Sequence, residues 1–513
     1  MATTTSFKNL IDIPVWRPNT PLPVATAAGM SVASDLRNSD RNAPFNYLIA
    51  SNTQMFAYLP ANDEWMPLIS PGLAGTFGAG ATSVFHPTQG PRGTIAAGAT
   101  TTQFTLTTAL PAAVAINQLA NAGDGGGFYV RVVGNAAGSS GKTEVRQVIA
   151  NTAGTNPTVV LDSPLTFTPA TGDTYEFRSG RVYMLGAGTV AANIWRFYDV
   201  LTNSLNAVAL ATANLPATIT VDSTLVALSE GHTPVNANVG EGYLGLITAT
   251  ATSGTTITGS AMPAALAANE YRNFQIRIVT DPTTPTAVGQ RRRISSHTGG
   301  ATGVFTVAAW AVTPSATAVF VVENDDDKIL LLSGSAATVY NYNIAANTWD
   351  TTTWAAAAAA RGAGTVCAHS FGIQVDPANR YARHSNIFSF RGGNVATLDV
   401  LDIAGSATGT WSSAITYGNS STLFTTGSCG VYDAVTNGGK YLYMQVSGTQ
   451  RFIRFDLLNR ILEPWTYLRY PQGAATVGSK LHMAFFIDGS TKLSFLFSPR
   501  QTGTEQFSIL CQR

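Results

Sequence analysis

Residues 136–143 have almost the spacing of a phosphate-binding P-loop. They read Ala-Ala-Gly-Ser-Ser-Gly-Lys-Thr, so Ala136 stands where that motif has its first glycine. A P-loop holds phosphate only when it leads into a helix N-terminus, where backbone amides surround the anion. Residues 144–150 have the pattern of a strand instead. The sequence therefore predicts a hairpin loop here.

Two short charge clusters could also bind ligands. Residues 291–293 are three arginines, which could contact phosphate or a glycan, and residues 325–327 are three aspartates, which could offer oxygens to calcium. A single triplet is not a basic patch, and no further spaced Asp or Asn follows the aspartates as a calcium loop would require. We therefore expect the arginines on a solvated or subunit-facing strand and the aspartates in a charged linker.

The residue types of common active sites are scattered. The six histidines have no metal-ligand spacing, there is no Gly-x-Ser-x-Gly motif, and no convincing carboxylate pair is present. Three cysteines form neither a disulfide framework nor a metal knuckle, and we expect Cys429 and Cys511 to be buried as small apolar residues. The sequence thus predicts no catalytic, cofactor-binding or metal-binding residues, no cofactor and no enzymatic activity.

The composition restricts the partners of the chain. A net charge of +1 over 513 residues gives no field that would attract nucleic acid or an anionic membrane. The N-terminus lacks the features of a signal peptide, and no apolar run reaches the ~20 residues of a membrane helix. Only 12% of residues are charged, a low share that favours association with neighbours. We expect assembly in a cytoplasm.

A long internal repeat indicates how these residues are organised. Its two copies share an apolar strand, an Arg and Ile pair, a Thr- and Pro-rich turn and an aromatic strand. The first copy includes residues 128–133, Arg146, Ile149, Tyr175 and Phe177, and the second includes residues 274–279, Arg291, Ile294, Phe320 and Val322. A repeat of this length predicts a modular chain in which a small β domain occurs twice.

A shorter signature recurs outside the long repeat. An aromatic residue ends a strand, and a Trp or Leu follows seven positions later, as in Tyr58…Trp65, Tyr198…Leu205, Tyr342…Trp349 and Phe455…Leu462. The first three copies place Asp63, Asn203 and Asn347 five residues after the aromatic. Asp and Asn tolerate the left-handed backbone conformation, so this position predicts a hairpin turn.

This signature resembles the blade of a kelch-type β-propeller, whose glycine doublet is present at Gly392-Gly393. Blades of this type take ~50 residues, and two spacings exceed that length where the repeated domains lie. The resemblance implies an all-β, kelch-like propeller of roughly six blades, with two paralogous small β domains inserted between early blades and residues 506–512 closing the ring against an N-terminal strand. The expected organisation is 1–45, extended arm; 46–87, first propeller segment; 88–178, first inserted domain; 179–237, blade; 238–324, second inserted domain; and 325–513, remaining blades.

The two repeated domains are similar to small β domains embedded in virion proteins of tailed bacteriophages. That resemblance implies a non-enzymatic structural component of a tail, fibre or capsid, located in the virion and assembled in the host cytoplasm. Its partners would be copies of itself and other virion proteins. One alternative is a glycan-binding propeller that recognises a host surface through exposed aromatic residues. A second is a glycan-cleaving enzyme, which would require a buried carboxylate pair in the central channel.

Overall fold

The computed structural model is all-β. It describes residues 16–510 except 27, 36–44, 61, 75–77, 79, 109, 111–113, 122–126, 136–138, 140, 229–243, 265, 324–326, 370–385, 418–423, 434–439, 458, 470–479, 489–490 and 500–502. In these ranges the helical structure is limited to two 3-10 turns, η1 (Gln118–Ala120) and η2 (Pro285–Ala287). The all-β prediction is confirmed.

Six antiparallel sheets share one plan, in which strands pair in order from a first strand outward. The first three are β2 (Ser31–Ser34), β3 (Asn46–Ile49), β4 (Met55–Leu59) and β5 (Glu64–Pro67); β6 (Thr82–His86), β13 (Arg181–Leu185), β15 (Trp195–Asp199) and β16 (Ser204–Leu205); and β18 (Thr224–Leu228), β25 (Lys328–Leu332), β26 (Val339–Asn343) and β27 (Thr348–Asp350). The last three are β28 (Val366–His369), β29 (Asn386–Phe390), β30 (Thr397–Asp402), β31 (Thr410–Trp411) and β32 (Ile415–Thr416); β33 (Cys429–Asp433), β34 (Tyr441–Gln445), β35 (Arg451–Asp456) and β36 (Ile461–Arg469); and β37 (His482–Asp488), β38 (Thr491–Pro499), β39 (Gln506–Leu510) and β1 (Arg17–Asn19).

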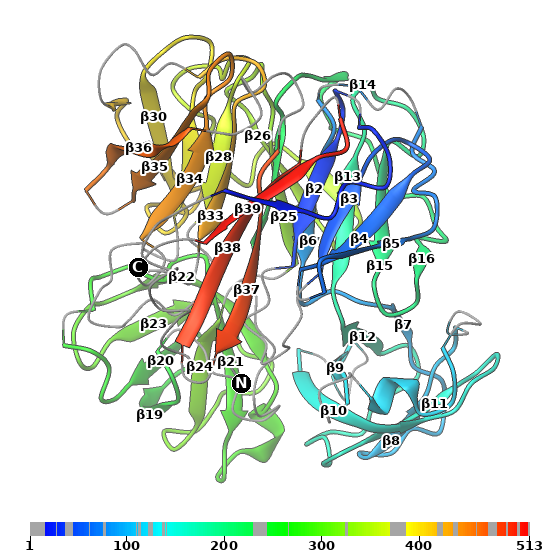
Figure 1. Ribbon diagram of the computed structural model, residues 1–513. Coiled ribbons are helices and arrows are strands. Elements are labelled where there is room, and N and C mark those ends of the chain that lie inside the picture. Colours follow the sequence, from blue (N-terminus) through cyan, green and yellow to red (C-terminus); the bar gives the residue numbers. More distant parts are fainter. Residues whose placement is uncertain are drawn as a thin grey trace.

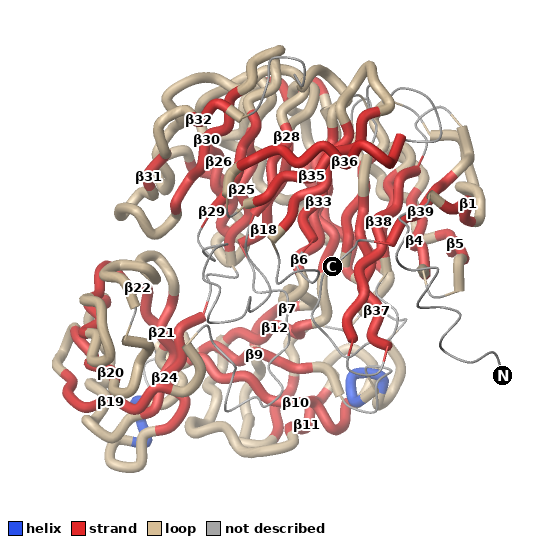
Figure 2. The backbone as a smooth tube through the Cα atoms, turned by 60° about the vertical axis from the view of Figure 1, so that its left-hand side comes forward, coloured by secondary structure: helices blue, strands red, loops and turns tan. Residues whose placement is uncertain are grey.

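The first strands of these six sheets contact one another in a closed circuit. The order of contact is β2, β6, β18, β28, β33, β37 and again β2. We call the six sheets joined in this way the ring. Its sheets lie above the two smaller domains in Figure 1 and Figure 2. A short two-stranded sheet, β14 (Gly188–Thr189) with β17 (Thr218–Ile219), links the second and third sheets.

The sixth sheet combines both ends of the described chain. Arg17 pairs with Ser508 and Asn19 with Gln506, so β1 covers the edge of β39. This pairing confirms the prediction that the last strand meets an N-terminal one. It also corrects the prediction of an extended arm over residues 1–45, since β1 and β2 lie within that range. Backbone pairing with other sheet strands holds both segments.

Two smaller domains have the same strand order. The first contains β7 (Arg92–Thr94), β12 (Thr174–Arg178), β9 (Tyr129–Val133), β10 (Thr143–Asn151), β11 (Thr158–Leu161) and β8 (Gln103–Thr105), with a single bridge between Ile95 and Leu106 linking its edges. The second is a closed barrel of β19 (Ile247–Thr252), β24 (Val319–Glu323), β21 (Gln275–Thr280), β22 (Arg291–His297), β23 (Val304–Val307) and β20 (Thr256–Gly259). Matching order at matching repeat positions is consistent with duplication of one unit.

The points at which these domains are inserted differ from the prediction. We expected them between blades, but each lies inside a sheet of the ring: the first follows β6 and precedes β13, and the second follows β18 and precedes β25. The segments 46–87 and 179–237 therefore each end on the first strand of the following sheet. These first strands lack the aromatic signature. The sequence therefore did not indicate that β6 pairs with β13 or that β18 pairs with β25.

The recurring aromatic signature sets the register of the outer hairpins. Each aromatic residue lies directly opposite the Trp or Leu seven positions later, as Tyr58 does opposite Trp65. The predicted left-handed turn is confirmed at Asp63, Asn203 and Asn347, with φ values of 52°, 47° and 52°. In all three copies the tyrosine hydroxyl donates to Oδ1 of this turn residue, at 2.6, 3.0 and 2.8 Å. A side-chain bond thus fixes the turn within each hairpin.

Replacing Asn203 tests this turn. Asn203→Ala should lower the free energy of unfolding by about 2 kcal/mol, because alanine disfavours φ > 0 and the bond from Tyr198 is lost. Asn203→Gly should cost about 1 kcal/mol, since glycine accepts the backbone angle but not the hydrogen bond. Urea denaturation followed by tryptophan fluorescence would measure both. Equal losses in the two variants would contradict a conformational role.

In each small domain a buried polar side chain accepts a hydrogen bond from a backbone amide of a nearby turn. The side chain is Asn151 in the first domain and His297 in the second. In the first domain, Asn151 Oδ1 accepts from the Leu119 amide, and the Asn117 side chain accepts from the Asn151 amide. In the second, His297 Nε2 accepts from the Tyr271 amide, and the Asn269 side chain accepts from the His297 amide. His297 is therefore neutral, with its proton on Nδ1 beside the Thr298 carbonyl.

The histidine should make the second domain sensitive to acid. Burial lowers the pKa of His297, so the unfolded state binds a proton more readily than the folded state. Its contribution to stability is present above the ordinary pKa of about 6.5 and is lost as the pH falls below that value. We expect hydrogen-exchange protection around Tyr271 to drop between pH 7.5 and 5.5, and His297→Asn to remove this drop.

The first domain supplies an internal control, because Asn151 does not titrate. Protection around Leu119 should therefore change little over the same pH range in either protein. Equal acid sensitivity of wild type and His297→Asn would contradict the assignment.

Candidate functional site

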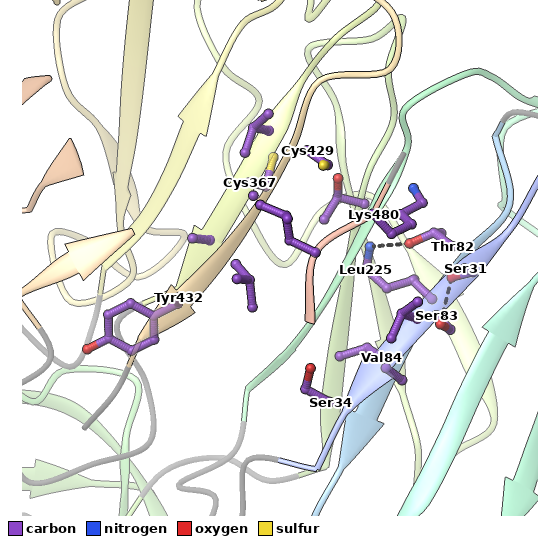
Figure 3. Close-up of a pocket in the computed structure, with 18 of the residues that line it drawn as sticks. Ser31, Ser34, Thr82, Ser83, Val84, Leu225, Cys367, Cys429, Tyr432 and Lys480 are labelled. Carbon is purple, nitrogen blue, oxygen red and sulfur yellow. Dashed lines mark hydrogen bonds between the residues drawn. The ribbon is translucent and has the colours of Figure 1, made fainter. Parts of the chain in front are cut away.

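A cavity of about 200 Å³ lies at the centre of the ring. Residues from all six first strands, or directly before them, line it: Ser31 and Ser34, Thr82 and Val84, Asp222 and Leu225, Val366 and Cys367, Cys429 and Tyr432, and Lys480 and Leu481. Figure 3 shows Lys480 near Thr82, away from Ser34 and Tyr432. Among the described cavities we take this one as the candidate site, because every sheet of the ring contributes to it.

Four hydroxyl groups of the wall bond neighbouring sheets to one another. Ser31 Oγ on β2 lies 2.6 Å from Ser83 Oγ on β6. Thr82 Oγ1 accepts from the Leu225 amide on β18, and Ser34 Oγ accepts from the Met483 amide on β37. These bonds cross three different sheet boundaries and satisfy polar groups that burial would otherwise leave unpaired. The wall therefore joins neighbouring sheets of the ring, and we call this set of hydrogen bonds between sheets the seam.

Asp222 joins three sheets at once. It precedes β18 with a left-handed φ of 58°, and its Oδ2 accepts from the amides of Gly364 and Gly427, which precede β28 and β33. Burial raises the pKa of Asp222, while the charge of Lys480, which precedes β37, and the two amides oppose that rise. No local pattern indicated this residue, because its partners are more than a hundred positions away.

The two described cysteines line the same cavity and are buried as thiols. Burial raises the pKa of Cys367, and it raises the pKa of Cys429 to about 12. Cys367 Sγ donates weakly to Ser389 Oγ at 3.6 Å. Both stay protonated near neutral pH and lack the thiolate that nucleophilic chemistry needs. Burial of Cys429 is confirmed, whereas Cys511 lies outside the described residues.

A second cluster of charged residues joins the small domains to the ring. Arg131 of the first domain bonds Glu176 at 2.5 Å and Asp327 at 2.7 Å. Arg291 of the second domain lies 3.0 Å from Glu323 and 3.8 Å from Asp327. Asp327 directly precedes β25, so one carboxylate connects both domains to the third sheet. Asp325 and Asp326 lie outside the described residues.

The prediction of a solvated strand is thus corrected for Arg291, which makes an internal ion pair. Arg291 pairs with Glu323, and its side chain is only 11% exposed. The Arg292 guanidinium lies 5.7 Å from the Trp310 ring and that of Arg293 lies 5.7 Å from the Trp354 ring. The sequence showed three adjacent charges, but their contacts with Glu323, Trp310 and Trp354 depend on how the barrel folds and how it packs on the ring. Asp327 lies in the linker between β24 and β25, as predicted, and its partly exposed side chain takes part in an ion-pair cluster.

The P-loop-like segment connects two strands of a hairpin, as predicted. β9 and β10 pair antiparallel on either side of it, and the Gly134 amide donates to the Lys142 carbonyl. Lys142 is buried 5.6 Å from the Phe167 ring, and it also forms a β-bridge with Gln290 of the second domain. This residue therefore connects the two small domains.

The described part of the chain contains no group of three His, Cys, Asp or Glu side chains placed to hold a metal ion. It also has no helix of the length and apolarity needed to cross a bilayer. His86, His297 and His482 are buried in separate places, while His232 and His384 fall outside the described residues.

Replacing Asp222 tests the seam. Asp222→Ala leaves two buried amides without an acceptor and places alanine at positive φ, so we expect a loss of roughly 3 kcal/mol in the free energy of unfolding. Asp222→Asn keeps an oxygen acceptor and tolerates the backbone angle, and should lose about 1 kcal/mol or less. Chemical denaturation compares the two. Similar stabilities would show that the amides find other partners.

Comparison with known proteins leaves the family open. No family model matches the sequence, and no curated protein matches it. Among solved structures, the chain is similar to one in the mitotic checkpoint complex (9% identity, TM-score 0.34, covering 97% of this chain and 91% of that chain) and to YjhT (9% identity, TM-score 0.36, 96% of each). A chain of hydrazine synthase from Kuenenia stuttgartiensis has 10% identity and a TM-score of 0.18, over 37% of this chain and 47% of that one. These TM-scores are too low to support an argument about fold or function.

Proposed function

We propose that the ring is a kelch-like β-propeller of six blades and that the protein is a structural component of a tailed-phage virion. Three observations support the first part: the closed circuit of first strands, the repeated aromatic turn, and the positive φ of both Gly392 and Gly393. A Cβ on Gly392 would come within 2.6 Å of the Ala363 carbonyl oxygen, so the doublet requires glycine there.

The observation that carries the structural role is the way the two small domains are attached. Each is tied at both ends to adjacent strands of one blade, they form a β-bridge with each other at Lys142 and Gln290, and both reach Asp327. In the second domain, the Asn273 side chain also donates to the carbonyls of Ile403 and Ser406 on the fourth blade. These ties favour a rigid body that presents fixed surfaces to neighbours.

Assembly in many copies is the proposed mechanism. The low share of charged residues leaves a surface suited to contact with copies of the chain and with other virion proteins. The resemblance of the small domains to β domains of phage virion proteins supports the assignment to a phage particle. The proposal covers a component of the tail, of a fibre or of the capsid.

Co-sedimentation tests the proposal. In a density gradient of the source material, peptides of this chain should appear in the particle fraction, at a fixed ratio to the major capsid protein across fractions and preparations. Quantitative peptide mass spectrometry measures that ratio. Recovery of the chain in the soluble fraction alone would overturn a virion role, whatever the fold.

A further inference from the structure

Two opposite charges meet the central cavity without forming an ion pair. Asp222 precedes β18 and Lys480 precedes β37, and both line the cavity. The ammonium attracts the carboxylate electrostatically, yet among the described residues no ion pair joins them. A small molecule could therefore bond to both groups from within the cavity.

The carboxylate of Asp222 has one oxygen available. Both described hydrogen bonds, from the amides of Gly364 and Gly427, are accepted by Oδ2. They fix the orientation of the carboxylate and leave Oδ1 as an acceptor at the cavity wall. Asp222 itself is only 6% exposed, so this oxygen is held in a largely desolvated position. Hydrogen bonds to charged groups in such positions contribute more than those on an open surface.

The rest of the wall favours a neutral polyol. Hydroxyls of Ser31, Ser83 and Thr82 lie beside the aliphatic side chains of Val84, Leu225 and Val366. A volume of about 200 Å³ is large enough for several water molecules or for one small ring compound. Inorganic anions would be repelled by Asp222, and a small zwitterion would leave the aliphatic side chains of the wall without a contact.

We propose that this cavity binds a single sugar ring, with one hydroxyl donating to Asp222 Oδ1 and a neighbouring hydroxyl accepting from the Lys480 ammonium. The C–H face of the ring would lie against the aliphatic side chains. The proposal goes beyond the assembly role and is independent of it, because it depends on the cavity and not on the particle. It places recognition at the centre of the ring rather than on aromatic residues of the outer loops.

Titration of the full-length protein with defined probes tests this assignment. The probes are the methyl α-glycosides of glucose, galactose and mannose, with glycine as a zwitterion and sodium phosphate as an anion. Saturation-transfer NMR and isothermal calorimetry report binding. We expect saturable binding of at least one glycoside, and no competition by glycine or phosphate.

Variants connect the binding to the two charges. Lys480→Met keeps the aliphatic stem and removes the ammonium, and Asp222→Asn turns an acceptor into a donor; each should weaken glycoside binding at least tenfold. Lys440→Met is the matched control, because Lys440 pairs with Asp456 outside the cavity, and it should bind as wild type does. Near-ultraviolet circular dichroism verifies folding, and the partly exposed Lys480 site provides a test even if Asp222→Asn unfolds.

Three results would overturn the proposal. The first is the absence of saturable glycoside binding to wild type, which would mean that the cavity holds water only. The second is glycoside binding unchanged in both variants. The third is preferential binding of glycine or phosphate, which would assign the charges to a different ligand. Co-sedimentation with particles is measured separately, so either proposal can fail alone.

Discussion

Closure of the ring depends on the contact of β2 with β37, and the antiparallel pairing of β1 with β39 adds an N-terminal strand to the same sheet as β37. Without β1, the outer edge of β39 would expose unpaired amides and carbonyls, and an exposed edge favours pairing with other chains. The pairing also connects the two ends of the described chain without a covalent bond. Each of the six first strands can then contact two neighbours, and this arrangement creates both the seam and the cavity.

The seam explains why a polar centre is compatible with stability. Hydroxyl and carboxylate groups at the centre of the ring cost free energy unless they are bonded, and here Ser31, Thr82 and Asp222 bond groups on adjacent sheets. The same bonds specify which sheets are neighbours. A purely aliphatic centre would also hold the sheets together, but apolar contacts have no preferred direction and would specify the neighbouring sheets less strictly.

The small domains depend on the ring in a different way. The first has its own hydrophobic core, while the core of the second continues into the ring through residues such as Val226, Leu330 and Trp354. The ion pairs around Asp327 add orientation rather than much stability, because desolvation offsets a large part of the attraction between buried charges. The two small domains thus differ in how they are attached to the ring. They also differ at one internal turn, where the second has His297 and the first has Asn151.

Patterns within contiguous segments of the sequence were enough to predict local structure. The long repeat predicted the duplicated unit, the spacing from each aromatic residue to its Asp or Asn predicted the left-handed turns, and the resemblance of the signature to a propeller blade implied an all-β chain. Contacts between distant segments could be seen only in the folded chain. The pairing of Thr82–His86 with Arg181–Leu185 across an entire domain, the meeting of Asp222 with Gly364 and Gly427, and the enclosure of residues 291–293 all join distant segments. Such contacts follow from closure of the ring, and no local pattern encodes them.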